Sequence, residues 1–171
     1  YQFTGCLQSY SLNILMVNFW KKLPRPFYVL APMEDVTDCV FRQIVCSIGK
    51  SDVLFTEFVN VDGLCSSGRN HLLHRFKFSE IEHPIVAQIW GMNPAHYYQV
   101  AQELVAMGFD GIDINMGCPV KSVLKTGACA ALIENQILAK EIILATLEGV
   151  KGRLPVSLKT RIGIKTIVTQ E

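Results

Sequence analysis

Five short apolar segments that each end in polar residues constrain the fold of this chain more than any other feature. They lie at residues 28–33, 52–58, 84–89, 111–116 and 155–159. Stretches with helical spacing of apolar residues separate them, and strands that alternate with helices form a parallel sheet. The segments are apolar along their lengths, as expected when both faces of a sheet are covered. The sequence therefore predicts an α/β fold with five parallel strands.

Capping residues and glycines set the expected limits of the helices. The first helix follows a cap at Thr37 or Asp38 and ends at Gly49. Its expected apolar stripe consists of Val40, Phe41, Ile44, Val45 and Ile48. Two further helices are expected at residues 94–107, after an asparagine cap, and at about 135–150. The stretch around 60–77 is expected to be mixed, with a loop at 63–68 and a helical turn or two at 72–76, and the stretch at 121–127 is expected to be a loop.

Polar or functional side chains gather at the carboxyl end of every predicted strand. They are Met33 and Glu34, Glu57, Gln88, Asn115 and Cys118, and Lys159 and Arg161. Five strands that each change from apolar to polar residues at the carboxyl end indicate a shared site. That site lies either at the top of a (β/α)₈ barrel or in the crevice of an open sheet. No Gly-x-Gly-x-x-Gly motif follows any of these strands, which disfavours a Rossmann sheet.

The segment from 111 to 120 carries the most specific chemistry. Asp113 and Asn115 face one side of the predicted strand, and the strand breaks at Gly117, immediately before the thiol of Cys118. A free cysteine is usually buried and inert. A thiol that directly follows a buried strand instead occupies the place where α/β enzymes carry active-site groups.

Composition excludes several other classes of protein. Half of the 171 residues are hydrophobic and the net charge is +1, which indicates a globular chain with no overall electrostatic preference for nucleic acid. The six cysteines form no Cys-x-x-Cys pair, so no metal site is expected, and their scatter suits a reducing cytoplasm. No apolar run reaches the ~20 residues of a membrane helix. The four histidines are expected at the surface.

The polar strand ends belong to five motifs that occur in a fixed order. The motifs are Ala31-Pro32-Met33 with Val36-Thr37-Asp38, Thr56-Glu57, Gln88 before Gly91, Asp113-Ile114-Asn115-Met116-Gly117-Cys118-Pro119, and Lys159-Thr160-Arg161-Ile162-Gly163. Over about residues 28–165 this order resembles the tRNA-dihydrouridine synthases, which are FMN-dependent TIM-barrel enzymes. The Asn-x-Gly-Cys-Pro element is the most specific part. The resemblance implies an incomplete (β/α)₈ TIM barrel of about the first five βα units.

The resemblance also implies which residues bind the cofactor. Pro32, Met33 and Glu34 would lie against the flavin, Gln88 would bond the edge of its ring, and Lys159 would lie near its N1–C2 carbonyl side. Many family members carry a small residue followed by glycine where this chain has Glu34-Asp35. NADPH is the reductant of the flavin that the family favours.

The implied reaction reduces the C5–C6 bond of uridine in tRNA, with a hydride from reduced FMN and a proton from Cys118. An ordinary thiol has a pKa of about 8.5 and is mostly protonated at neutral pH, so it can act as an acid. Asn115 would face the uracil, because an amide offers both a donor and an acceptor. Arg161 would point into the same cavity, toward RNA, and Gly117 would leave room for the base.

Other interpretations remain open from the sequence alone. The chain can be another FMN barrel that acts on a free pyrimidine, as dihydroorotate dehydrogenases do, or a catalytically inactive fragment that binds RNA or a partner. Asn115 can simply cap its loop, Gln88 can satisfy buried backbone groups, and Lys159 and Arg161 can form a solvated strand end. Glu57 can pair with a nearby Arg or Lys.

The length of the chain affects these expectations. Residues 1–15 match nothing around them and are expected to be an upstream or non-native extension, with a truncated FMN-binding barrel at 16–171. A complete barrel needs about 200 residues or more, and the phosphate of its ligand commonly binds after strands seven and eight. The chain alone is therefore expected to bind FMN poorly, to be inactive or unstable, and to expose an unpaired sheet edge.

Overall fold

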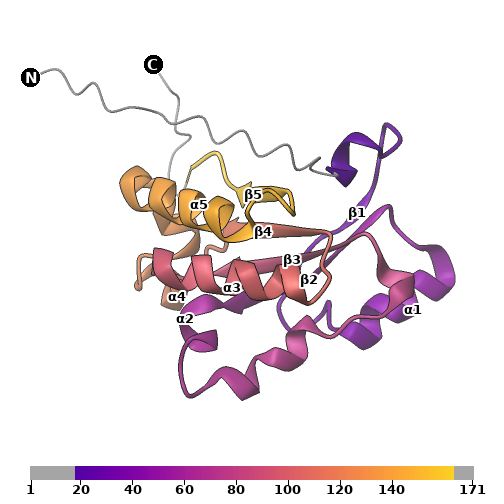
Figure 1. Ribbon diagram of the computed structural model, residues 1–171, viewed down its shortest axis with the longest axis horizontal. Coiled ribbons are helices and arrows are strands. Elements are labelled where there is room, and N and C mark those ends of the chain that lie inside the picture. Colours follow the sequence, from indigo (N-terminus) through magenta and orange to yellow (C-terminus); the bar gives the residue numbers. More distant parts are fainter. Residues whose placement is uncertain (1–17, 164–171) are drawn as a thin grey trace, which may run out of the picture.

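A computed structural model of the protein describes residues 18–163, so the prediction for residues 1–15 lies outside the described residues. Five parallel strands form one sheet, and each strand pairs with the next one in the chain (Figure 1). The strands are β1 (Val29–Leu30), β2 (Val53–Asn60), β3 (Ile85–Trp90), β4 (Gly111–Met116) and β5 (Val156–Thr160). Consecutive βα units have this order in a (β/α)₈ barrel. The predicted α/β fold and incomplete barrel are confirmed.

Helical segments connect the strands. The α-helices are α1 (Cys39–Gly49), α2 (Val61–Leu64), α3 (Pro94–Ala106), α4 (Lys121–Leu124) and α5 (Gln136–Val150). Short 3₁₀ turns are η1 (Phe19–Lys21), η2 (Arg69–His71), η3 (Leu73–Phe76), η4 (Glu80–Glu82) and η5 (Cys129–Ile133). The long helices begin as predicted, because the side chains of Asp38, Asn93 and Asn135 accept hydrogen bonds from the first backbone N–H groups. The segment after Cys118 was expected to be a loop, and it contains α4 and η5 instead.

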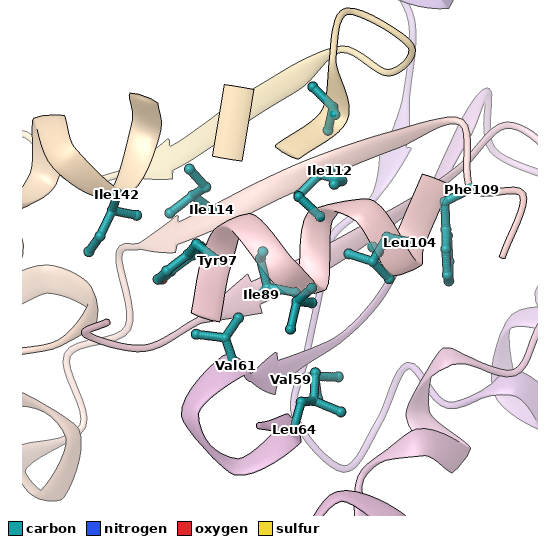
Figure 2. Close-up of a cluster of buried hydrophobic side chains, with 14 of the residues drawn as sticks. Val59, Val61, Leu64, Ile89, Tyr97, Leu104, Phe109, Ile112, Ile114 and Ile142 are labelled. Atoms are coloured by element: carbon teal, nitrogen blue, oxygen red, sulfur yellow. The ribbon is translucent and has the colours of Figure 1, made fainter. Parts of the chain in front are cut away.

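Helices α3 and α5 cover the outer face of the sheet and form the main core with it (Figure 1). Tyr97 and Leu104 of α3 are fully buried against Ile89, Ile112 and Ile114 of the sheet (Figure 2). The predicted apolar face of α3 is confirmed, because its residues occur every third or fourth position and so lie on one side of the helix.

Gly149 of α5 lies directly against α3. A Cβ atom at this position would lie 2.5 Å from the carbonyl oxygen of Tyr98 and 2.8 Å from the Cβ of Ala101. We expect Gly149→Ala to lower the free energy of unfolding by about 1–3 kcal/mol, because the two helices must separate. Gly49→Ala is the matched control, since nothing lies within 4 Å of its Cβ position. Denaturant titration should find the control neutral or slightly stabilising; equal midpoints for both variants would contradict the expected clash.

The inner face of the sheet is closed at the amino ends of its strands. Phe19, Trp20 and Leu23, which precede β1, pack against a small cluster on that face. The cluster consists of Val53, Phe55 and Val86. Apolar packing therefore fills the amino end of the inner face, and polar side chains occupy it toward the carboxyl ends.

Helix α1 does not follow the prediction of a buried apolar stripe. Val40, Ile44 and Ile48 are 64%, 52% and 84% exposed, and the buried residue of this helix is Arg42. The helix is anchored by polar contacts with η4 and the segment before it rather than by its apolar side. The stripe was correctly recognised as apolar, but apolar spacing alone does not determine what covers a helix face.

The two outermost strands differ from the prediction in length and burial. β1 was expected at 28–33 and has only two residues, because Met33–Thr37 forms a turn after Pro32. The last three residues of β5 are exposed along the sheet edge, and within residues 18–163 no further strand pairs with β5, as the sequence led us to expect. Across residues 18–163, no helix has the length and apolarity to cross a membrane.

Candidate active site

The loop that carries Cys118 is fixed by hydrogen bonds at the carboxyl end of β4. The backbone N–H groups of Gly117 and Cys118 each donate to Oδ1 of Asn115 at 3.0 Å. Arg161 donates through Nε to the Gly117 carbonyl at 2.5 Å, and the Ala130 N–H donates to the Cys118 carbonyl at 3.4 Å. The thiol is thus presented half-buried on an ordered loop, at the strand end where the sequence placed it.

The backbone of β5 lies close to Gly117. We expected it to leave room for a base, but a Cβ atom there would face the backbone of β5, 3.4 Å from the Lys159 carbonyl oxygen. That distance is an ordinary van der Waals contact. A side chain at this position would therefore begin in contact with the neighbouring strand, and the expected room for a base stays a prediction.

A buried polar network joins three strands beneath this loop. Gln88 of β3, Asp113 of β4 and Ser157 of β5 stand side by side in the register of the sheet. Gln88 donates to Asp113 at 2.6 Å, Ser157 donates to the other carboxylate oxygen at 2.6 Å, and Asn115 donates to Gln88 at 3.2 Å. Burial raises the pKa of the Asp113 carboxyl, and the hydrogen bonds from Ser157 and Gln88 oppose that rise.

A cavity of about 320 Å³ opens beside this network on the inner side of the sheet. Its apolar wall includes Trp20, Phe27, Val29, Ala31, Pro32 and Phe55. Its other side is formed by Asp113, Ser157, Leu158 and Lys159. An apolar wall together with a cationic side chain suits a flat, electron-accepting ring that becomes negatively charged when reduced. Two predicted cofactor residues, Pro32 and Lys159, therefore line one cavity, and Gln88 is joined to it through Asp113.

The other two predicted cofactor residues lie in the turn after β1. Met33 is 39% exposed, and its backbone is held by the hydroxyl of Thr37. The Glu34 carboxylate forms an ion pair with Arg75, so the structure directs this side chain toward η3. Burial raises the pKa of Glu34, and Arg75 opposes that rise.

Asp35 occupies the position at which many family members carry glycine, and its surroundings show how this chain accommodates the larger residue. Its φ is +55°, a left-handed conformation that glycine adopts freely and that aspartate tolerates better than most residues. The Asp35 N–H donates to Oε1 of Glu57 at 2.9 Å, and its carboxylate lies 3.2 Å from Arg75. Arg75 also lies 3.4 Å from Glu57, so the expectation that Glu57 pairs with a cation is confirmed.

Three members of the site were not identified from the sequence. Asp113 and Ser157 have short polar side chains within strands, and their alternation with apolar residues was a usable signal for the inner face. Arg75 lies in the short turn η3, about forty positions from Glu34 and Asp35 and 18 positions from Glu57. No periodic pattern connects it with Glu34 or Glu57.

The histidines and the remaining cysteines complete the survey of reactive groups. His71 and His74 are exposed as predicted, whereas His83 and His96 are half-buried beside Asp110 and Asp62, at 2.5 and 2.8 Å. Within the described residues, no three His, Cys, Asp or Glu side chains are grouped so that they could hold a metal ion.

Cys129 contrasts with Cys118. It is fully buried, and burial, together with the nearby Cys118, raises the pKa of its thiol to about 12. It is therefore a small core residue of the inert kind, and Cys118 is the thiol of this face that solvent reaches.

Comparisons with known proteins identify the family of this chain. The family model for dihydrouridine synthase matches residues 29–170. A probable tRNA-dihydrouridine synthase of Staphylococcus aureus is 52% identical over 147 residues, and a probable tRNA-dihydrouridine synthase 2 of Bacillus subtilis is 49% identical over the same length. Each alignment covers 85% of this chain but 44% of the relative, so the chain spans less than half the length of these relatives. The chain belongs to the dihydrouridine synthase family.

Proposed function

We propose that the protein carrying this chain reduces uridine in tRNA to dihydrouridine, with FMN as its cofactor and NADPH as the reductant of the flavin. The observation that carries the proposal is the position of Cys118 on an ordered loop, above a network that reaches the cavity lined by Pro32 and Lys159. Since tRNA is the substrate, we place the reaction in the cytoplasm.

The flavin would supply the hydride, and the residues of this chain would supply position and protons. Pro32 offers an apolar surface for the ring, and Lys159 offers a positive charge where the reduced ring is negative. Met33 and the turn that Arg75 holds would border the same ring. Cys118 would donate a proton to C5 of the uracil, because its thiol is half-buried rather than sealed in the core and a thiol can act as a general acid.

The uracil must leave its stack in the folded RNA before it can reach Cys118. The amide of Asn115 is engaged by the loop and by Gln88, so its contact with the base would use lone pairs or N–H bonds that these partners leave free. Arg161 holds the Gly117 carbonyl through Nε. Its terminal nitrogens are the part of the guanidinium that would contact RNA.

Deleting the gene in its source organism tests the proposal. We expect dihydrouridine to disappear from at least one position of the tRNA pool, as measured by mass spectrometry of digested tRNA, and to return on complementation. Protein purified from that organism should carry FMN, identified by its absorbance and mass. Unchanged dihydrouridine at every tRNA position after deletion would refute the proposed activity.

A further inference from the structure

We propose that Asp113 is a positioning residue that fixes the loop carrying Cys118 by setting the direction of two side-chain amides. Among the described residues, the side-chain hydrogen bonds of Asp113 go to Gln88 and Ser157 and not to the loop or the thiol. Asp113 acts through Gln88 and Asn115, which connect it to the backbone of Gly117 and Cys118. The inference deepens the proposed function, on which its catalytic purpose rests, but the geometry can be tested without flavin or RNA.

The hydrogen bonds between the loop and Asp113 form a series in which every group donates toward Asp113. Gln88 presents Nε2 to Oδ2 of Asp113 at 2.6 Å, so the carboxyl oxygen accepts this hydrogen bond. The Gln88 oxygen Oε1 then faces Asn115 and accepts from its Nδ2 at 3.2 Å. This leaves Oδ1 of Asn115 toward the loop, where it accepts the two backbone N–H groups.

Each amide has one donating end and one accepting end, so the end that faces Asp113 determines the end that faces the loop. An Asn115 amide turned the other way would present Nδ2 to two backbone N–H groups and leave both unpaired. Gln88, Asp113 and Asn115 are 1%, 2% and 5% exposed, so solvent is poorly placed to replace a lost partner.

Ser157 holds Asp113 at the end of this hydrogen-bond series that lies farthest from the loop. Its hydroxyl donates to Oδ1 of Asp113 at 2.6 Å, on the opposite side of the carboxylate from Gln88. Removing that hydroxyl leaves the bond between Gln88 and Asp113 in place. Ser157→Ala is therefore a matched control, because it removes a bond to the same carboxylate without reversing either amide.

Hydrogen exchange resolved to single amides tests the inference in the complete protein. In Asp113→Leu, Gln88 has no acceptor in front of it, and we expect the amides of Gly117 and Cys118 to exchange about tenfold faster or more. The amide of Ile112, which donates to the Pro155 carbonyl at 3.0 Å, serves as the reference for the sheet. It should keep its rate, as should all three amides in Ser157→Ala.

Asp113→Asn separates positioning from simple packing. The new side chain can present its oxygen to Gln88 and its nitrogen to the Ser157 hydroxyl, so both amides keep their orientation. Exchange of the Gly117 and Cys118 amides should therefore stay close to the rate in the parent protein. Equal acceleration of Ile112 and the two loop amides in Asp113→Leu, or unchanged loop amides, would overturn the inference. So would an Asp113→Asn variant that exchanges as fast as Asp113→Leu.

Measurement of tRNA dihydrouridine in strains carrying the same alleles keeps the two proposals separate. If the parent allele makes no dihydrouridine, the proposed function fails, whereas the exchange rates still decide the role of Asp113. If the parent is active, Asp113→Leu should lose most of the product and Asp113→Asn should retain it.

Discussion

Replacing Cys118 with alanine should abolish dihydrouridine formation while leaving tRNA binding intact. A positioned proton donor contributes about 10²- to 10⁴-fold to a reaction rate, and a methyl group cannot donate a proton. The loop itself should keep its shape, because it is held through backbone groups of Gly117 and Cys118. The measurement compares dihydrouridine in tRNA from a deletion strain complemented with the parent or the Cys118→Ala allele, alongside tRNA binding by each purified protein.

Cys46→Ala is the control for this experiment. Cys46 is half-buried in α1, away from the site, and alanine is a good helix residue, so this allele should restore dihydrouridine fully. If the Cys118→Ala allele also restored dihydrouridine, Cys118 would not be the acid. Loss of tRNA binding together with activity would instead point to a role in shaping the RNA surface.

The largest loss of stability is expected from Arg42→Met. Arg42 is fully buried, lies 2.5 Å from Glu82, and donates to the carbonyls of Thr37 and Lys77 at 2.7 and 2.6 Å. Without it, a buried carboxylate and two carbonyls lose their cationic partner. We expect the free energy of unfolding to fall by about 3–5 kcal/mol, as is typical when one member of a buried ion pair is removed.

Arg69→Met provides the matched control. The ion pair between Arg69 and Glu103 has the same chemistry at 2.6 Å, but its side chains are about one-third exposed. Water can solvate both charges there, so the loss should be at most about 1 kcal/mol. Denaturant titration of the two variants compares them directly. Similar denaturation midpoints for the two variants would contradict the expected difference. They would mean that Glu82 finds another partner, or becomes protonated with little loss of free energy of unfolding.

Local patterns in the sequence were sufficient to identify the five parallel strands and the three long helices. The spacing of Tyr97, Val100 and Leu104 identified the buried face of α3, and Asn93-Pro94 fixed its start. The polar residue that follows each strand identified the edge at which the site forms. These signals work because cap, strand and helix preferences depend on neighbours a few positions away.

Contacts between distant parts of the chain were beyond such reasoning. Arg42 with Glu82 and Arg75 with Glu34 join segments about forty positions apart, and each residue alone resembles an ordinary surface charge. The roles of the site residues stay predictions, but their surroundings are now defined. Asn115 caps its own loop, as one alternative held, and Gln88 bonds side chains rather than backbone groups.

The strand order has a consequence for the way this chain acquires its structure. Each strand pairs with the one made immediately before it, so every sheet contact joins segments one βα unit apart. Loop closure between such near neighbours costs little entropy, and a new unit can dock on the growing edge without rearranging earlier ones. Assembly can therefore follow synthesis on the ribosome, with the Cys118 loop secured only after β5 brings Ser157 and Arg161 to their partners.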